Sequence, residues 1–303
     1  MTTSTFAIKV DVDTFSGTRD GVPRLLELFD AFGIKATFYF SMGPDNSGKA
    51  IRRIFTRKGF LKKMIRTKAP SMYGLKTLLY GTLLPAPQIA ASFPAVLQGV
   101  FEHGHEVGIH CWDHVYWHDK LPEMTGETVR KELDKAGRKF LEILGRRAET
   151  TAAPGWTVST NSLQVQDTLS LRYCSDSRGN SPFYPVFEGK RYKTLQLPTT
   201  FPTMDELLGT EGLSADTIND HYLSLVRSGL NVHTIHAELE GGGMVDVFKD
   251  LLQRLLRADA RFVTLSQAAE EALSLAPSAC GLAMEEIPGR AGLVAVQGEP
   301  VTN

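Results

Sequence analysis

The sequence contains little cysteine and no long hydrophobic run. Its three cysteines, Cys111, Cys174 and Cys280, are scattered and odd in number, which argues against a disulfide framework and suits a reducing compartment. No run of about 18 uninterrupted apolar residues occurs, so we expect no membrane-spanning helix. The N-terminus also lacks the basic segment and apolar run of a signal peptide. We therefore expect a cytosolic protein, or one that sits on a membrane from the cytosolic side.

Acidic residues are missing from one long segment. The whole chain is near neutral, with a formal charge of −1, so we expect no nucleic-acid partner. Between Asp45 and Glu102 there is no acidic residue, and apolar residues recur there about once per helical turn. A basic amphipathic insertion at about residues 45–100 is a candidate to bind an anionic membrane surface or a phosphate-bearing ligand, although a solvated helical insertion is the alternative. Its basic residues are Lys49, Arg52, Arg53, Arg57, Lys58, Lys62, Lys63, Arg66, Lys68 and Lys76.

Strand-like and helix-like segments alternate along the chain. Phe6–Val12 is rich in β-forming residues, Val22–Phe32 has helical spacing and ends at Gly33, and Ala36–Ser41 is a second strand. This βαβ opening implies parallel pairing. The further strands that we predict lie at Glu106–Ile109, Lys193–Leu197, Val232–His236 and Arg261–Thr264, and the further helices at Glu127–Leu144 and about Val245–Leu256.

This alternation favours one (β/α) barrel over two domains. We expect a single catalytic domain over residues 1–275 that carries the basic insertion. Residues 276–303 are rich in glycine, alanine, proline and glutamate and have weak periodicity. We expect them to form a surface tail.

Two carboxylates lie at the end of the first predicted strand, in V-D-V-D-T-F. Asp11 and Asp13 are two residues apart, so on a strand they point to the same side. The carboxyl-terminal end of a barrel strand is where active sites occur, and two such carboxylates repel each other unless a cation or a proton lies between them. The alternative is a turn in which the aspartates only bond to the backbone.

Histidines gather in two other places. His110 and His114 follow a predicted strand, and two imidazoles four residues apart can converge on one metal ion if the chain turns helical there. Two unrelated polar histidines are the alternative. His236 closes a later β-rich run and is a candidate general acid on the opposite lip of the barrel, or else a core histidine. His233 faces the other side of that strand, and we expect His103, His105 and His118 to be structural or surface residues.

Four segments resemble a known family in their order: V-D-V-D-T, G-H-E-V-G-I-H-C-W-D-H, A-A-P-G-W and T-I-H. They are similar to the successive motifs of the polysaccharide deacetylase (NodB-like) family of metal-dependent amide hydrolases, whose fold is a distorted (β/α) barrel. The resemblance implies that Asp11 is the catalytic base and His236 the catalytic acid. It also implies that Asp13, His110 and His114 bind one divalent metal ion, for which Zn, Mn, Co and Ni are all suitable.

Further segments resemble one branch of this family. They are F-S-M-G-P-D-N, L-R-Y-C-S-D-S-R-G, L-P-T-T-F-P-T-M-D-E and T-I-H-A-E-L-E-G. This branch removes the formyl group from undecaprenyl-phosphate-linked 4-deoxy-4-formamido-L-arabinose, in the lipid A modification that gives polymyxin resistance. The resemblance implies a lipid-linked sugar substrate and a peripheral location at the cytoplasmic face of the inner membrane, with the basic insertion against anionic lipid.

The resemblance also implies supporting residues. The family's third motif usually has an arginine that orients the catalytic aspartate; this chain has Ala152 there, and we expect Arg178 to replace that arginine. We expect Asp176 to hold the catalytic histidine in its cationic form. Backbone N–H groups near Gly155 and Trp156 are candidates for an oxyanion site.

A tight pocket is expected for the small formyl group. Trp112, Trp156 or Phe201 could form its floor, and Glu238 is a further candidate for substrate binding or support. Two other functions stay open: a soluble sugar N-deacetylase, and a non-catalytic carbohydrate- or lipid-binding protein on the same scaffold. The basic insertion argues against the soluble enzyme, which has no evident use for it.

Overall fold

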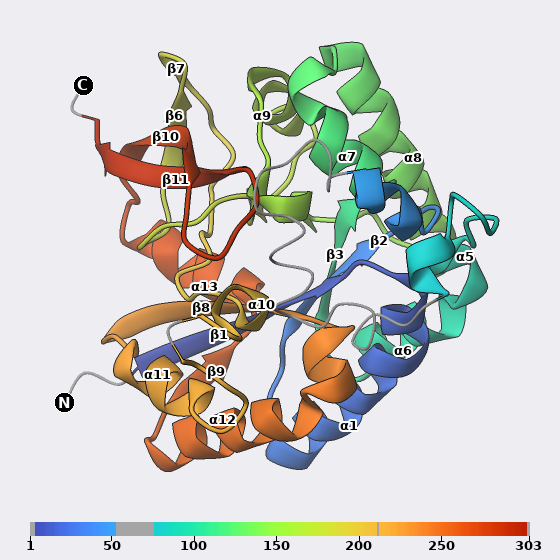
Figure 1. Cartoon of the computed structure of the whole chain (residues 1–303). Coiled ribbons are helices and arrows are strands. Elements are labelled where there is room, and N and C mark those ends of the chain that lie inside the picture. Colours follow the sequence, from blue (N-terminus) through green and yellow to red (C-terminus); the bar gives the residue numbers. More distant parts are fainter. Residues whose placement is uncertain (1–3, 53–75, 211, 302–303) are drawn as a thin grey trace.

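The computed structural model describes residues 4–52, 76–210 and 212–301. Its centre is a seven-stranded parallel sheet that curves into a partial barrel, with helices along its outer side (Figure 1). The strands run in the order β5-β4-β3-β2-β1-β8, and β9 pairs with the first part of β1. Their bounds are β1 Ser4–Val12, β2 Thr37–Ser41, β3 Glu106–Cys111, β4 Thr150–Thr151, β5 Tyr173–Cys174, β8 Gly229–His236 and β9 Arg261–Val263.

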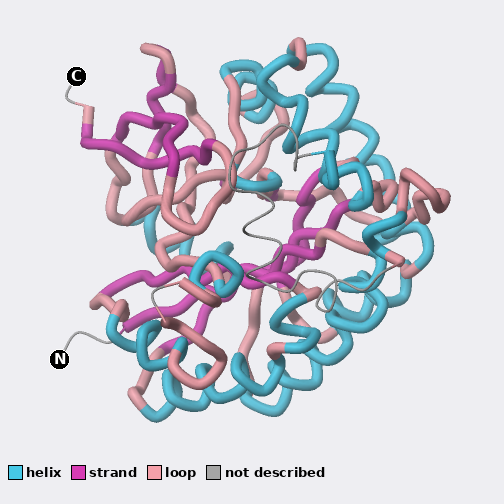
Figure 2. The backbone as a smooth tube through the Cα atoms, in the orientation of Figure 1, coloured by secondary structure: helices cyan, strands magenta, loops and turns pink. Residues whose placement is uncertain are grey.

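Helices connect these strands and cover the sheet from outside (Figure 2). α1 shows why the sequence forms them: its apolar residues recur on one face, and Gly33 ends it in the left-handed conformation, at φ 64°, as predicted. The helices are α1 Val22–Phe32, α5 Ile89–Ser92, α6 Pro94–Glu102, α7 His114–Lys120, α8 Gly126–Leu144, α9 Thr160–Gln166, α10 Met204–Leu207, α11 Ile218–Ser224, α12 Val245–Arg257 and α13 Leu265–Ser274. None of the helices in the described ranges is long and apolar enough to cross a bilayer.

The central strand β1 is buried on both faces. Ile8 and Val10 belong to the large core between sheet and helices. Ala7, one residue earlier, belongs to a smaller cluster inside the barrel with Tyr39 and Tyr173. Because side chains alternate along a strand, the odd-numbered residues of β1 face the barrel interior. This parity directs the acidic residues at the end of β1 into the barrel.

One predicted strand has a different form. Lys193–Leu197 is not a strand, although it lies where a strand would close the barrel between β5 and β8. Leu195 and Leu197 exchange backbone hydrogen bonds of 2.8 Å with Cys174 of β5, and Phe201 N–H donates to Val232 of β8 at 3.2 Å. Between the two leucines Gln196 exchanges backbone hydrogen bonds with Phe183, at 2.8 and 3.1 Å, and Pro198 has no N–H to donate, so the segment forms isolated bridges and no continuous ladder. The other predicted strands and helices are present, within a few residues at their ends.

The expectation that residues 276–303 form a surface tail is wrong. Residues 279–300 form two strands that join β6 and β7 in a second sheet of order β11-β10-β6-β7 (Figure 1). Leu282 and Ala295 are buried in its core. The bounds are β6 Tyr184–Phe187, β7 Lys190–Arg191, β10 Ala279–Glu286 and β11 Leu293–Pro300. The assignment of residues 1–275 to one catalytic domain stays a prediction.

Residues 53–75 of the basic insertion, which carry seven of its ten basic residues, lie outside the described residues. On either side the chain forms two short 3-10 helices, Ser47–Arg52 and Thr77–Leu79. The predicted amphipathic helices of the insertion therefore stay a prediction.

Candidate metal centre and active site

Three predicted ligands converge at the carboxyl-terminal end of the sheet. Asp13 follows β1, His110 lies near the end of β3, and His114 is the first residue of α7. Nε2 of His110 lies 3.2 Å from Asp13 Oδ1, and Nε2 of His114 lies 3.3 Å from Asp13 Oδ2. One ligand atom from each residue falls within 4.8 Å of the others. One carboxylate and two imidazoles at this spacing fit a divalent transition metal and leave coordination positions open.

A turn from strand to helix brings the two histidines together. The spacing had suggested that one helix carries both histidines. Instead, His110 is still extended in β3, and only His114 belongs to a helix. Asp113 caps α7: its side chain accepts the N–H of Tyr116 at 2.9 Å and the side-chain amide of Asn46 at 2.6 Å. This cap sets where the helix starts and so where His114 points.

The charges in the site favour a cation. Burial raises the pKa of Asp13, but His114 and His110 outweigh burial and hold that pKa well below its ordinary value. Burial lowers the pKa of His110, but the carboxylates of Asp11 and Asp13 outweigh it, so the net pKa is raised. Protons and a metal ion therefore compete for the same imidazoles.

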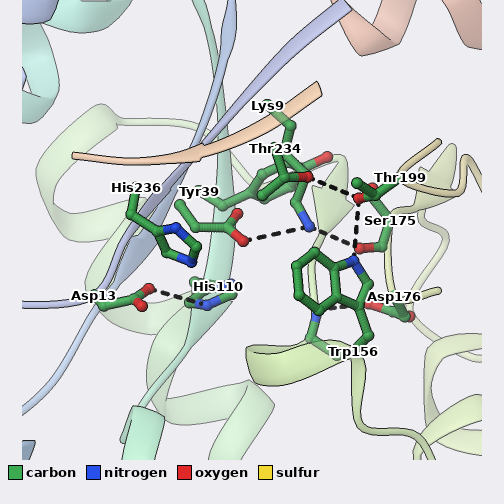
Figure 3. Close-up of polar contacts among 12 residues, drawn as sticks. Lys9, Asp13, Tyr39, His110, Trp156, Ser175, Asp176, Thr199, Thr234 and His236 are labelled. Atoms are coloured by element: carbon green, nitrogen blue, oxygen red, sulfur yellow. Dashed lines mark hydrogen bonds and ion pairs between the residues drawn. The ribbon is translucent and has the colours of Figure 1, made fainter. Parts of the chain in front are cut away.

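Asp11 lies beside this centre, and Lys9 holds it. Nζ of Lys9 is 3.4 Å from Asp11 Oδ2 and donates to the carbonyl of Ser175 at 3.1 Å (Figure 3). The expectation that Arg178 replaces the family's arginine is wrong in this structure. Arg178 donates to both carboxylate oxygens of Glu206, at 2.8 and 3.0 Å.

His236 lies next to Asp11 and not across the barrel from it. The two residues are register partners on the neighbouring strands β8 and β1. The backbone N–H of His236 donates to Glu240 at 2.8 Å, and its Nδ1 lies 4.0 Å from Asp205 Oδ1. The carboxylate that the structure places beside Nδ1 of this ring is therefore that of Asp205, at the start of α10, whereas Asp176 bonds to other residues.

Asp176 and Glu238 are buried carboxyls with structural contacts. Asp176 accepts hydrogen bonds from the N–H of Ala153 at 2.7 Å and from Gln166 at 2.8 Å, and burial raises its pKa. In Figure 3 it lies behind Trp156, away from His236. Glu238 Oε1 accepts the N–H of Asp13 at 2.9 Å and of Thr14 at 2.7 Å, so it supports the loop that carries the metal ligand. Burial, and then the charge of Asp13, raise the pKa of Glu238 to about 8.

Trp156 is buried, and both of its N–H groups are hydrogen-bonded within the protein, so the oxyanion role of backbone N–H groups near Gly155 stays a prediction. Its backbone N–H bonds to the carbonyl of Ala153 at 3.2 Å, and its indole N–H donates to Thr199 at 3.1 Å. Its ring is flanked by the guanidinium groups of Arg178, at 4.9 Å, and of Arg290, at 4.7 Å, from the loop between β10 and β11. Gly155 adopts φ 60°, and the ring of His118 occupies the space that a Cβ would need.

The remaining candidates have packing contacts. Trp112 is half-buried and packs against Gly43, where any Cβ would meet its ring at 2.6 Å. Phe201 packs in the core between Phe6 and Tyr222, so it is not the pocket floor that we expected. His233 is also a core residue, and burial lowers its pKa to about 3.

Sequence reasoning missed Lys9, Asp205 and Arg290. Lys9 had a readable signal, because it stands two residues before Asp11 on a strand and so shares its face. Asp205 lies in the branch-like segment L-P-T-T-F-P-T-M-D-E, but nothing in that segment linked it to His236, and Arg290 had no signal, since a hairpin loop distant in the chain brings it to the site.

Comparisons with known proteins agree with this geometry. Residues 4–174, more than half of the chain, match the family model for polysaccharide deacetylase. A Shewanella sediminis protein named "Probable 4-deoxy-4-formamido-L-arabinose-phosphoundecaprenol deformylase ArnD" is 39% identical over 85% of this chain and 83% of that protein. A protein of the same name from Wigglesworthia glossinidia brevipalpis is 30% identical over 93% of this chain and 98% of its own length.

A solved structure shows the same fold. It is described as a polysaccharide deacetylase from Mycobacterium smegmatis and superposes with a TM-score of 0.65 at 17% identity, covering 95% of this chain and 96% of that chain. This match supports the distorted barrel that the sequence predicted. Together with the family model and the two relatives, it leads to one assignment: the chain belongs to the polysaccharide deacetylase family.

Proposed function

We propose that this protein is a metal-dependent amide hydrolase that removes the formyl group from undecaprenyl-phosphate-linked 4-deoxy-4-formamido-L-arabinose. The observation that carries the proposal is the meeting of Asp13, His110 and His114 at one point, beside Asp11 and His236. The two relatives named as deformylases for this lipid-linked sugar align with most of the chain and support the substrate.

A formamide is a poor electrophile with a poor leaving group. Asp13, His110 and His114 would hold a divalent cation, which would supply Lewis acidity and lower the pKa of water from 15.7 to about 7. Asp11 acts as the general base, because its Oδ1 is buried and has no hydrogen-bond partner among the described residues. Its Oδ2 is already bound to Lys9.

His236 donates the proton to the leaving amine. Its main chain is fixed by Glu240 and by the ladder with β1, so its ring position is determined by strand register. Oδ1 of Asp205 lies 4.0 Å from Nδ1 of His236, so this carboxylate lies beside the ring that we assign as the acid. Acid and base therefore act from adjacent strands on the two sides of one amide bond.

The location follows from the substrate. A sugar on a polyprenyl carrier is presented at a bilayer surface, so the protein works as a peripheral protein on the cytoplasmic face of the inner membrane. Each basic residue near an anionic surface contributes about 1 kcal/mol, so the ten basic residues between Asp45 and Glu102 supply attraction without a spanning helix. The site does not select among Zn, Mn, Co and Ni by its donor set.

The decisive experiment is mass spectrometry of the lipid-linked formamido sugar before and after incubation with purified protein and each metal. We expect loss of the formyl group, and no loss with the Asp11→Asn variant. A matched acetamido sugar distinguishes a general N-deacetylase, which would cleave both. If neither sugar changes with any metal, a non-catalytic binding protein becomes the better explanation.

A further inference from the structure

We propose that Lys9 is a positioning residue for the reaction, which binds one oxygen of the Asp11 carboxylate and leaves the other oxygen to act as the base. The inference rests on the proposed function, because it concerns the same base. Lys9, Asp11 and Asp13 occupy alternate positions at the end of β1, so the first two side chains share the face that lines the barrel interior and the third continues toward the metal centre.

The ammonium group has one defined position. The Lys9 side chain is 0% exposed, and its Nζ contacts Asp11 Oδ2 and the carbonyl oxygen of Ser175. A buried ammonium without such partners would be strongly destabilising. These two partners therefore keep the ammonium group inside the barrel. Asp11 lies near the end of β1, and Ser175 follows β5.

Two aromatic rings enclose the same ammonium. Nζ lies 5.3 Å from the centroid of the Trp156 ring and 5.7 Å from that of Tyr39 (Figure 3). Both distances are within the range of cation–π attraction. Trp156 is itself fixed by its indole hydrogen bond to Thr199. The rings restrict the lysine to the direction of Asp11 and Ser175.

The two oxygens of Asp11 consequently have different environments. Oδ2 is held by Lys9, whereas Oδ1 is buried and has no hydrogen-bond partner in the described part of the chain. Asp11 stands two residues before the predicted metal ligand Asp13 and is the register partner of His236, so its carboxylate is presented at the same end of the sheet as the metal centre. A base held by one oxygen keeps the other at a fixed place, and a displacement of about 1 Å in such a group can cost about 100-fold in rate.

The test uses three variants with a soluble methyl glycoside of the formamido sugar as substrate. Lys9→Met keeps the chain length and removes the charge, Lys9→Arg keeps the charge, and Lys35→Met is a control at an exposed lysine. We expect Lys9→Met to lower kcat about 100-fold with KM and metal affinity nearly unchanged, and Lys9→Arg to recover about 10-fold or more of that loss. In an Asp11→Asn background, Lys9→Met should cost no further activity.

A second readout does not need activity. In metal-free protein, Lys9→Met should lower the urea midpoint because it leaves the buried Asp11 carboxylate unpaired, and adding Asp11→Asn should restore part of it. The inference would be overturned if the effects of Lys9→Met and Asp11→Asn were additive, either on activity or on the urea midpoint. It would also be overturned if Lys9→Arg were as inactive as Lys9→Met. If the unaltered protein hydrolyses no formamide, the proposed function fails, and the urea cycle still decides whether Lys9 and Asp11 are coupled.

Discussion

Glu238 offers a test of how the metal ligand Asp13 is held in place. Its Oε1 accepts three hydrogen bonds, at 2.9 Å from Asp13 N, 2.7 Å from Thr14 N and 2.8 Å from Thr14 Oγ1. Glu238→Ala leaves two buried backbone donors without an acceptor, at roughly 1–3 kcal/mol each, so the free energy of unfolding should fall by about 2–6 kcal/mol. Loss of support behind a metal ligand should also weaken metal binding about 10- to 100-fold.

Glu238→Gln is the matched control. The raised pKa of Glu238, about 8, means that the carboxyl group is mostly protonated at neutral pH in the metal-free protein, and glutamine keeps an acceptor in the same place. We therefore expect Glu238→Gln to retain most of the stability and metal affinity. Between pH 4.5, the ordinary pKa of glutamate, and about pH 8, the folded state binds a proton at Glu238 that the unfolded state has lost. The free energy of unfolding of the parent protein should therefore fall as pH rises through this window. The fall should be smaller in Glu238→Gln.

The assays are urea unfolding in chelator at several pH values and isothermal titration with divalent metal. The reasoning would be refuted by a folded Glu238→Ala protein with the parent's unfolding midpoint and metal affinity. It would be refuted equally by a Glu238→Gln variant as impaired as Glu238→Ala, because the acceptor oxygen would then not be the relevant feature.

Four further predictions follow from the same structure. Metal affinity should decrease as pH falls through the raised pKa of His110, since protons then compete for its ring; calorimetric titrations at pH 5 to 8 would show a flat profile if this is wrong. Asp205→Asn should lower kcat about 10- to 100-fold with little change in metal affinity, which steady-state kinetics and metal titration check together. Gly155→Ala should destabilise by about 1–3 kcal/mol, because φ is 60° and the ring of His118 fills the Cβ position; an unchanged thermal midpoint would contradict it. Leu282→Ala should cost about 2–5 kcal/mol in urea unfolding if the C-terminal hairpin is part of the folded core, whereas a dispensable tail would give no change.

The local elements of the barrel could be predicted because their signals are local. The apolar spacing of Val22–Phe32 and the glycine after it specify a helix and its end without reference to any other segment. The C-terminal hairpin could not be predicted this way. Its buried positions, such as Leu282 and Ala295, are few and separated by exposed residues, and they become a core only against β6.

In the candidate site, too, some features could be predicted from the sequence and others depend on the fold. The sequence by itself indicated the donor set of Asp13, His110 and His114 through its resemblance to the family's motifs, whereas the spacing alone left open which aspartate joins the two histidines. Only the tertiary structure decided that Lys9 pairs with Asp11 and that Asp205 faces His236. Pairing between charges depends on which strands are neighbours and on how distant loops cross the end of the sheet, and no short stretch of sequence contains that information.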